Sequence, residues 1–344
     1  MTSPYVIRPV RESDYEGFRE LRDQAGAGFT SLSVNDATLR ARIGKSSEVY
    51  GAALTEPGPN QRYLLALEHL DTGVLAGVAG VKACVGDMPP FYNFRVLKIS
   101  QASAAANRRY DMEVLILVNE FTGCSEVGSL FVRPEHRAAG VGRMLAQARY
   151  MLMAADPHRF SDEVVSELRG VVDDHGASPF WEHLGRHFFK MDFEDADKLS
   201  ASTDNQFILD LMPRYPIYAD LLPEAARAVI GKCHPQGVGA LKLLQWEGFR
   251  YERVVDIFDG GPLVTCARDN IRTFRQSRRI EIRADETLSK RRRALVARPT
   301  ISDFRCASGD IEMRDGVAYA LRETLAAAGL QSGESALIWS DDAN

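Results

Sequence analysis

The sequence lacks the features that mark secreted, membrane-spanning and metal-stapled proteins. Its 344 residues include five cysteines, which lie far apart and form no CxxC pair. That spacing argues against a disulfide framework or a zinc site and favours free thiols in a reducing compartment. No uninterrupted apolar stretch approaches the roughly 18 residues of a membrane-spanning helix. The first residues carry charge where a signal peptide would be apolar. We therefore expect a cytoplasmic protein with no membrane partner.

The chain also has no excess of basic over acidic residues. The chain has 42 Lys and Arg residues against 47 Asp and Glu residues, which gives a formal net charge of −5. Nucleic-acid-binding proteins usually carry a basic footprint. One arginine-rich stretch, residues 268–293, is interrupted by acidic residues and contains a single aromatic, Phe274. We expect that stretch to be a solvated or subunit-facing surface, and we expect no nucleic-acid partner.

The chain shows an alternation of strand-like and helical patterns. Strands are predicted at residues 5–9, 63–68, 74–81, 113–118, 126–132, 164–172 and 249–258, and helices at residues 13–23, 37–45, 144–155, 241–247 and 316–327. This alternation predicts an α/β (α+β) fold with a mixed sheet. We expect residues 1–280 to form one domain with a helical insertion around 193–230. Residues 281–344 are expected to form a small C-terminal α/β subdomain that is rich in strands.

The most informative segment joins a predicted strand to a predicted helix at residues 130–142, which read LFVRPEHRAAGVG. A diphosphate bound at such a turn needs backbone N–H donors in one concavity and the positive end of a helix dipole. Gly140 and Gly142 permit close backbone approach, and Arg137 and Arg143 add positive charge. The residues expected to contact the diphosphate carrier are Leu130, Phe131, Val132, Arg137, Ala138, Ala139, Gly140, Val141, Gly142 and Arg143. The alternative is a tight connection whose glycines only relieve steric crowding.

Two resemblances follow from these residues. The RAAGVG turn at 137–142, placed after a strand, resembles the acyl-CoA pyrophosphate loop of the GCN5-related N-acetyltransferase superfamily. More narrowly, six ordered segments are similar to the arginine N-succinyltransferase family: GFTSL at 28–32, FYNFR at 91–95, RGVVDDHGASPFW at 169–181, LMPRYPIY at 211–218, IGKCHPQ at 230–236 and DIFDGGP at 256–262. The resemblance covers the chain from about residue 5 to residue 280, and the region after about residue 285 matches weakly.

The resemblance implies a fold and a reaction. The fold would be a mixed, mainly antiparallel sheet flanked by helices, with residues 1–280 as the acyl-CoA-dependent N-acyltransferase domain. The reaction would transfer succinyl from succinyl-CoA, a co-substrate, to the α-amine of L-arginine in arginine catabolism, giving N2-succinyl-L-arginine and CoA. The family places an acyl-CoA contact at Leu130 and a proton donor at His234. It implies no prosthetic group and no metal. A homo-oligomer or a pairing with a related subunit is expected, because some members pair two subunits.

Acyl transfer from a thioester to an amine requires a neutral amine, a stabilised oxyanion and protonation or screening of the leaving thiolate. Histidine suits the proton transfer near neutral pH. His234 lies on a predicted loop, and His175, our second choice, follows a predicted strand. The alternative for each histidine is a structural role in its turn. His183 and His187 are four residues apart but lack a third ligand, so we expect no metal site.

The charged groups of the substrates need partners that the sequence leaves open. Arg95, Arg169 and Arg214 are candidates for the succinyl carboxylate. Candidates for the guanidinium of arginine are Asp173, Asp174, Asp256 and Asp259. Backbone groups at Leu130 could pair with the pantetheine amides like an added strand. Two alternatives remain: the same mechanism with ornithine or another amine or acyl-CoA, and a fold-retaining, non-catalytic subunit of a heteromeric succinyltransferase.

Overall fold

A computed structural model describes residues 2–25, 34–87, 90–138, 140–173, 176–202 and 206–341. The segment 28–32 therefore lies outside the described residues. The chain divides into two compact units. Unit 1 comprises Met1–Cys84, Ser125–Asp162 and Ala267–Asn344, and unit 2 comprises Val85–Cys124 and Glu163–Cys266. Within the described part of the chain, no helix has both the length and the apolar character needed to cross a bilayer.

Unit 1 is built on an antiparallel sheet with the strand order β1-β2-β3-β6. Its strands are β1 (Tyr5–Pro9), β2 (Arg62–His69), β3 (Leu75–Lys82) and β6 (Ser125–Val132). The predicted hairpin of two apolar strands is confirmed in β2 and β3. On these strands alternate residues face opposite sides, and both sides are buried along most of β3. Helices must therefore cover both faces of the sheet.

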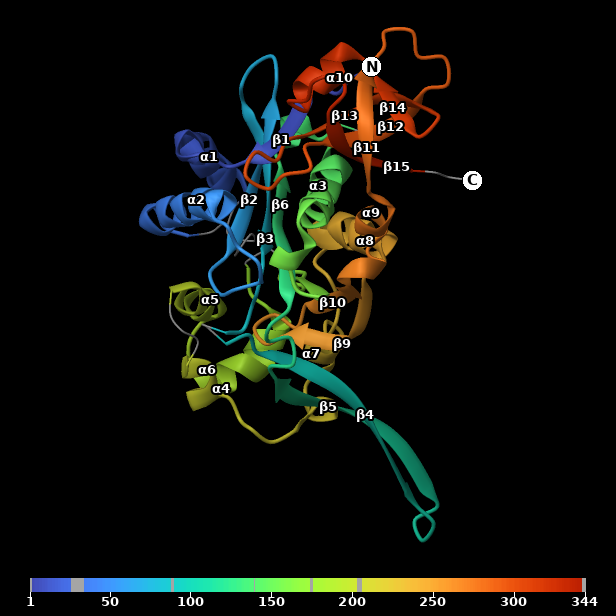
Figure 1. The fold of residues 1–344 in the computed structure, drawn as a ribbon. Coiled ribbons are helices and arrows are strands. Elements are labelled where there is room, and N and C mark those ends of the chain that lie inside the picture. The colour runs from blue at the N-terminus through green and yellow to red at the C-terminus, as the bar shows by residue number, and fades with distance from the viewer. Residues whose placement is uncertain are drawn as a thin grey trace. The chain divides into compact units, whose positions relative to one another are not determined.

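Three helices cover the sheet of unit 1 (Figure 1). They are α1 (Tyr15–Ala25), α2 (Asp36–Gly51) and α3 (Val141–Ala155). The first two pack on one face through a cluster that includes Phe18, Ile43 and Leu64. The third is buried along nearly its whole length and packs on the opposite face, where the Leu145 side chain lies against Gly77. The strand, turn and helix predicted around residues 126–155 are thus confirmed.

The C-terminal strands of unit 1 close into a small barrel. Its strand order is β12-β15-β11-β14-β13, and β13 pairs back onto β12. The elements are α9 (Arg272–Gln276), β11 (Arg278–Ala284), β12 (Arg292–Ala297), β13 (Cys306–Arg314), β14 (Val317–Ala320), α10 (Arg322–Ala327) and β15 (Ser335–Ser340). Closure leaves no free strand edge within the barrel. Strand β13 also pairs with β1, so the barrel is continuous with the N-terminal sheet.

The helix predicted at residues 316–327 is wrong in its first half, because β14 pairs with both β11 and β13. Sheet pairing outweighs the helical propensity of the two alanines in Val317–Ala320. The predicted boundary near residue 280 stays a prediction. Contacts group the barrel with the rest of unit 1.

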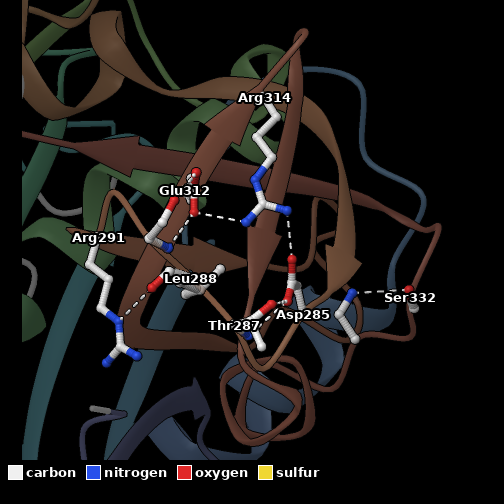
Figure 2. A network of polar contacts seen from close by, with 9 residues as sticks. Asp285, Thr287, Leu288, Arg291, Glu312, Arg314 and Ser332 are labelled. Carbon is white, nitrogen blue, oxygen red and sulfur yellow. Dashed lines mark hydrogen bonds and ion pairs between the residues drawn. The ribbon is translucent and has the colours of Figure 1, made fainter.

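A polar network fixes the loop between β11 and β12 (Figure 2). Arg314 donates to Asp285 at 2.6 Å and to Glu312 at 2.8 Å. Glu312 also accepts the Ser289 N–H at 2.7 Å, and Asp285 accepts the N–H and hydroxyl of Thr287 at 2.7 Å. The bonds from Thr287 and Arg314 lower the pKa of Asp285 to about 2. The loop is therefore held by charge-assisted bonds that require ionised carboxylates.

Unit 2 contains strands in the order β7-β10-β9-β4-β5-β8, and the pairs from β10 to β8 are antiparallel. Its strands are β4 (Asn93–Ser103), β5 (Arg108–Val118), β7 (Glu163–Glu167), β8 (Ile217–Tyr218), β9 (Arg250–Asp256) and β10 (Pro262–Ala267). Strands β4 and β5 form a long twisted ribbon whose outer half is exposed (Figure 1). Of this ribbon, only the inner end of β5, residues 113–118, was predicted as a strand. No part of β4 was predicted, and its outer half is largely exposed.

Helices and an aromatic core complete unit 2. A π-helical turn, Trp181–Gly185, leads into α4 (Arg186–Phe189) and is followed by α5 (Phe193–Ser202), α6 (Gln206–Leu211), α7 (Glu224–Arg227) and α8 (Val238–Glu247). Trp181 is fully buried and stacks on Phe189 with ring centroids 5.2 Å apart. Gly185 lies against the indole, where a Cβ would overlap the ring. The predicted fold class, a mixed and mainly antiparallel sheet with flanking helices, helical insertions and a strand-rich C-terminal region, is confirmed.

Candidate active site

The predicted diphosphate turn connects β6 to α3 in unit 1. After β6 a short 3-10 turn, Pro134–His136, reverses the chain. Gly140 then adopts a left-handed conformation with φ 88° and caps α3, and its carbonyl accepts the Met144 N–H at 2.8 Å. Only glycine adopts that φ without steric cost. Ala139 lies outside the described residues.

The two glycines of the turn face open space. A Cβ built on Gly140 or on Gly142 meets no heavy atom within 4 Å. Crowding inside the chain therefore does not explain Gly142, which is the alternative that the sequence left open. Among the residues that the structure describes, neither glycine N–H has a hydrogen-bond acceptor. Two amides at the positive end of α3 are thus available to an anion.

The two arginines of the turn are held by the chain in different ways. The Arg137 guanidinium donates to the carbonyl of Val132 at 2.9 Å and lies over the Phe131 ring. Because that acceptor is neutral, this bond leaves the positive charge of Arg137 uncompensated. Arg143 pairs with Asp341 at 2.9 Å, so part of its charge is already compensated. Arg137 is therefore the stronger source of positive potential at this turn.

A β-bulge interrupts β6 just before the turn. Val78 pairs with Phe131 and Gly80 pairs with Gly128, so Ala79 on β3 faces two residues of β6, Ser129 and Leu130. Ser129 has a φ of 52°, which is uncommon for a residue with a side chain. Bulges redirect backbone groups away from the ladder. The bulge was not predicted, although Gly128 is the kind of residue that often marks one.

Leu130 is half-buried, whereas Phe131 and Val132 are buried. A purely structural core leucine would be buried like its neighbours. The backbone of residues 129–130 is displaced from the pairing with β3, which suits the added-strand pairing with pantetheine amides that the sequence suggested.

His234 lies in unit 2 at the start of the 3-10 turn Pro235–Gly237. The backbone N–H of His234 donates to the Arg169 carbonyl at 2.8 Å, and the ring Nδ1 accepts the Gln236 N–H at 3.2 Å. An acceptor role for Nδ1 places the proton of the neutral ring on Nε2. Burial, and then the charge of Arg169, lower the pKa of His234. The ring is therefore neutral at pH 7 and presents Nε2–H as a donor.

Three of the six family-like segments meet around this histidine. Gly170 and Cys233 form a β-bridge, and the Gly231 N–H donates to the Gly260 carbonyl at 2.8 Å. Gly170 contacts Asp259 so closely that a Cβ would overlap the carboxylate. Glycines in these segments are therefore required by close backbone approach. The sequence contained these segments but no sign that they touch.

Two neighbouring carboxylates, one buried and one half-buried, support this junction. Asp259 is 7% exposed and accepts the N–H groups of Gly170 at 2.7 Å and Gly261 at 2.8 Å. Asp256 accepts the N–H groups of Phe258 and Asp259, both at 2.8 Å. Burial raises the pKa of both carboxyls, and the charge of Asp256 raises that of Asp259 further. Both carboxylates thus accept hydrogen bonds from backbone N–H groups, which argues for a structural role rather than guanidinium binding.

Cys233 is not a nucleophile in this arrangement. Burial, together with the charge of Asp259, raises the pKa of its thiol to about 11. The thiol is therefore neutral at pH 7, and the thiolate is the reactive form of cysteine. All five cysteines are free. Among the described residues no group of three or more His, Cys, Asp or Glu side chains could hold a metal ion.

The structure adds polar residues that the sequence did not single out. Asn93, the first residue of β4, is fully buried and pairs with Asp256 across the sheet. Its amide donates to Glu167 at 2.9 Å, and its Oδ1 is buried with no partner among the described residues. A polar residue at the centre of the aromatic FYNFR segment was the available sequence signal.

The remaining candidates differ in their surroundings. Arg95 is bound by Glu120 through two nitrogens, and Arg214 is exposed. Asp173 closes its own turn by accepting the Ala177 N–H at 2.9 Å. Asp174 and the second-choice histidine, His175, lie outside the described residues. Arg95 is thus occupied by the chain itself, which weakens its case as the partner of the succinyl carboxylate.

Comparison with known proteins places the chain in a family. A family model described as the arginine N-succinyltransferase beta subunit matches residues 5–273. The chain belongs to this family. It is 44% identical to the arginine N-succinyltransferases of Escherichia coli strains O17:K52:H18 and K12, over 277 residues and 80% of each chain. The solved structure of arginine/ornithine succinyltransferase subunit AI from Pseudomonas aeruginosa superposes with a TM-score of 0.87 at 31% identity and covers 98% of both chains.

Membership confirms the resemblance that the six segments carried. The family match ends at residue 273, before the closed barrel of residues 278–340. The Pseudomonas structure nevertheless covers 98% of this chain. The barrel is therefore shared with a solved relative, although its sequence is not part of the family match.

Proposed function

We propose that the chain is an arginine N-succinyltransferase, which transfers succinyl from succinyl-CoA to the α-amine of L-arginine. The supporting observation is the open turn at Gly140 and Gly142, in a member of the arginine N-succinyltransferase family. Amide donors at a helix N-terminus suit the diphosphate of coenzyme A. No prosthetic group is needed. Arginine catabolism in the cytoplasm is the proposed setting.

The residues divide the chemistry as follows. Residues 137–142 bind the diphosphate, and the bulged backbone at residues 129–130 binds the pantetheine amides. The neutral amine attacks the thioester carbonyl, a C–N bond forms and the C–S bond breaks. The nitrogen loses one proton and the leaving sulfur gains one, so the products are the amide and the thiol of CoA. His234 donates from Nε2–H toward that sulfur. Holding both substrates in a reactive geometry contributes much of the rate enhancement.

Purified protein mixed with succinyl-CoA and L-arginine tests the proposal. We expect arginine-dependent release of a thiol and a product whose mass is that of succinylarginine. L-Ornithine is the matched acceptor, since it keeps the α-amine and the α-carboxylate and lacks the guanidinium. Acetyl-CoA is the matched donor, since it lacks the second carboxylate. Thiol release that does not depend on an amine, or no release at all, contradicts the proposal.

The alternative of a non-catalytic subunit makes a different prediction. Such a chain would bind CoA at the turn and show no turnover by itself. Isothermal titration with CoA, run beside the turnover assay, separates this outcome from a misassigned cofactor. Self-association or pairing with a related subunit stays a prediction, which light scattering of the purified chain tests.

A further inference from the structure

Three cationic side chains gather on one end of the sheet in unit 1, and we call them the cation cluster: Arg42, Arg62 and Lys82. Arg62 is the first residue of β2 and lies directly opposite Lys82, the last residue of β3. Lys82 in turn lies opposite Glu126 on β6 and forms an ion pair with it. Arg42 reaches the same place from α2, where Arg62 and Glu126 influence its charge.

The cluster carries more positive than negative charge. Glu126 is paired with Lys82 at 2.5 Å and is the carboxylate that also acts on both arginines. Among the described residues, no hydrogen bond or ion pair engages the Arg62 guanidinium, which is half-buried. Like charges directly opposite each other on neighbouring strands destabilise a sheet. The chain therefore keeps a partly desolvated cation without an internal partner.

Burial, and then the neighbouring Arg62, lower the pKa of Arg42 to about 10. Burial also lowers the pKa of Arg62. For Arg62, whose guanidinium has no bonded partner among the described residues, this direction means that nearby charge does not offset the cost of burial. An anion bound beside Arg62 would offset it.

Two glycines, Gly80 and Gly128, lie on the strands beside the cluster, and Gly80 is buried whereas Gly128 is half-buried. Gly80 and Gly128 lie directly opposite each other on β3 and β6. A Cβ on Gly80 would contact the side chains of Leu64 and Ser129. Because Leu64 belongs to the cluster under α1 and α2, Gly80 and the cations share one face. The Glu126 carboxylate lies 3.5 Å from the position that a Cβ of Gly128 would take. No other described atom lies within 4 Å of that position, so a small group could lie over Gly128 next to the cations.

The cluster lies at the opposite end of β6 from the diphosphate turn. Glu126 precedes Val132 by six residues, which is about 20 Å at the rise of a strand. An acyl-CoA bound at Gly140 and Gly142, with its pantetheine running back along β6 past the bulge, brings its acyl end toward the start of the strand. The end of a dicarboxylic acyl chain is a carboxylate.

We propose that the cation cluster, with Arg62 as its main ligand, binds the terminal carboxylate of the succinyl group. This inference rests on the proposed function and names the residues that select a dicarboxylic acyl donor. Arg62 presents a planar guanidinium, which matches a carboxylate in two parallel hydrogen bonds. An acyl group of the same length without the carboxylate would leave the arginine unpaired.

The test compares Arg62→Met with the charge-matched control Lys45→Met, an exposed lysine on α2. The donors are succinyl-CoA and butyryl-CoA, which have four-carbon acyl groups with and without the carboxylate. We expect Arg62→Met to lower kcat/KM for succinyl-CoA by about 10- to 100-fold and to leave butyryl-CoA within about twofold. Arg62→Lys should keep part of the preference, and Lys45→Met should resemble the wild type. An equal loss with both donors, or no loss, overturns the inference.

Binding without an acceptor separates this inference from the proposed function. Isothermal titration of wild type and Arg62→Met with succinyl-CoA, butyryl-CoA and CoA needs no turnover. We expect the wild type to prefer succinyl-CoA over butyryl-CoA, and Arg62→Met to bind the two equally. If the wild type shows the preference but transfers no acyl group, the proposed function fails and the site stands. If the wild type turns over but binds both donors equally, the site fails alone.

Discussion

Replacing Asp256 and Asp259 of unit 2 by asparagine should give opposite results, although each change removes one carboxylate. Asp256 uses a single oxygen, Oδ1, to accept the N–H groups of Phe258 and Asp259. An asparagine carbonyl can keep both bonds, and its amide can donate to Asp259. Asp259 instead uses both oxygens, one for Gly170 and one for Gly261. An asparagine amide there must face one of those N–H groups.

The geometry sets the size of the difference. Asp259 is 7% exposed, and leaving a buried N–H without an acceptor costs about 1–3 kcal/mol. We expect Asp259→Asn to lower the free energy of unfolding by about 2 kcal/mol at pH 7. Asp256→Asn loses no hydrogen bond and removes a like charge beside Asp259. Its free energy of unfolding should change by less than about 0.5 kcal/mol or increase.

The two variants should also differ in how stability depends on pH. Burial raises the pKa of both carboxyls in the folded chain. When folding raises the pKa of a carboxyl, the stability that it contributes is complete at pH values below the pKa of the unfolded chain, about 3.8. That stability is lost as the pH rises through the pKa of the folded chain. Asp256→Asn removes one of the two titrating groups. Relative to wild type, it should therefore gain stability as the pH increases.

Urea unfolding followed by tryptophan fluorescence at several pH values from about pH 4, near the unfolded pKa, to about pH 8.5 measures these differences. Trp181 lies in the core of unit 2 and reports its unfolding. Asp71→Asn, at an exposed turn, is the matched control and should leave stability unchanged. Equal destabilisation by the two asparagines, or a smaller loss at Asp259 than at Asp256, would refute the assignment of hydrogen bonds at this junction.

Three further predictions concern the turn, the histidine and the barrel. Gly142→Ala should keep or raise the melting temperature, since its Cβ meets nothing in the chain and alanine favours helices, yet raise KM for the acyl-CoA several-fold; an unchanged KM argues against close phosphate approach. His234→Ala should lower kcat about 100-fold or more while the Kd for CoA, measured by titration, stays the same. The pKa of Asp285 is lowered to about 2, so its contribution to the free energy of unfolding is present above about pH 3.8 and is lost as the pH falls through about 2. Arg314→Met should reduce this acid dependence of the free energy of unfolding, which circular dichroism measures.

Local patterns in the sequence were enough for much of unit 1. The strand, turn and helix around residues 126–155 are contiguous, and each is fixed by neighbours within a few residues. The left-handed φ of Gly140 follows from the same short segment. The whole of β4 was missed, and its outer half buries little on either face. A pattern that depends on burial cannot mark a ribbon that buries little.

The site in unit 2 depends on contacts that are far apart in the sequence. Gly170 and Asp259 are 89 positions apart, and their bond holds the segment that receives the His234 N–H. No periodicity connects such residues, so Asp259 appeared in the sequence only as a candidate ligand for a guanidinium. The pairing of Arg62 with Lys82 is likewise visible only once the strand register is known. The sequence could thus predict which residues were candidates for the site, but not which residues they would bond to or pair with.

The hydrogen bonds of His234 decide which proton chemistry it can perform. Its Nδ1 accepts the Gln236 N–H at 3.2 Å, so the neutral ring has its only proton on Nε2. A proton taken up at Nδ1 would break that bond, and burial and the charge of Arg169 already oppose it by lowering the pKa. The ring is therefore poorly placed to act as the base that deprotonates the amine. In its proposed role as proton donor, Nε2–H would donate to the leaving sulfur as negative charge develops there, and that stabilisation would exist in the transition state and not in the bound thioester. Loss of His234 should accordingly appear in kcat, with the affinity for CoA unchanged.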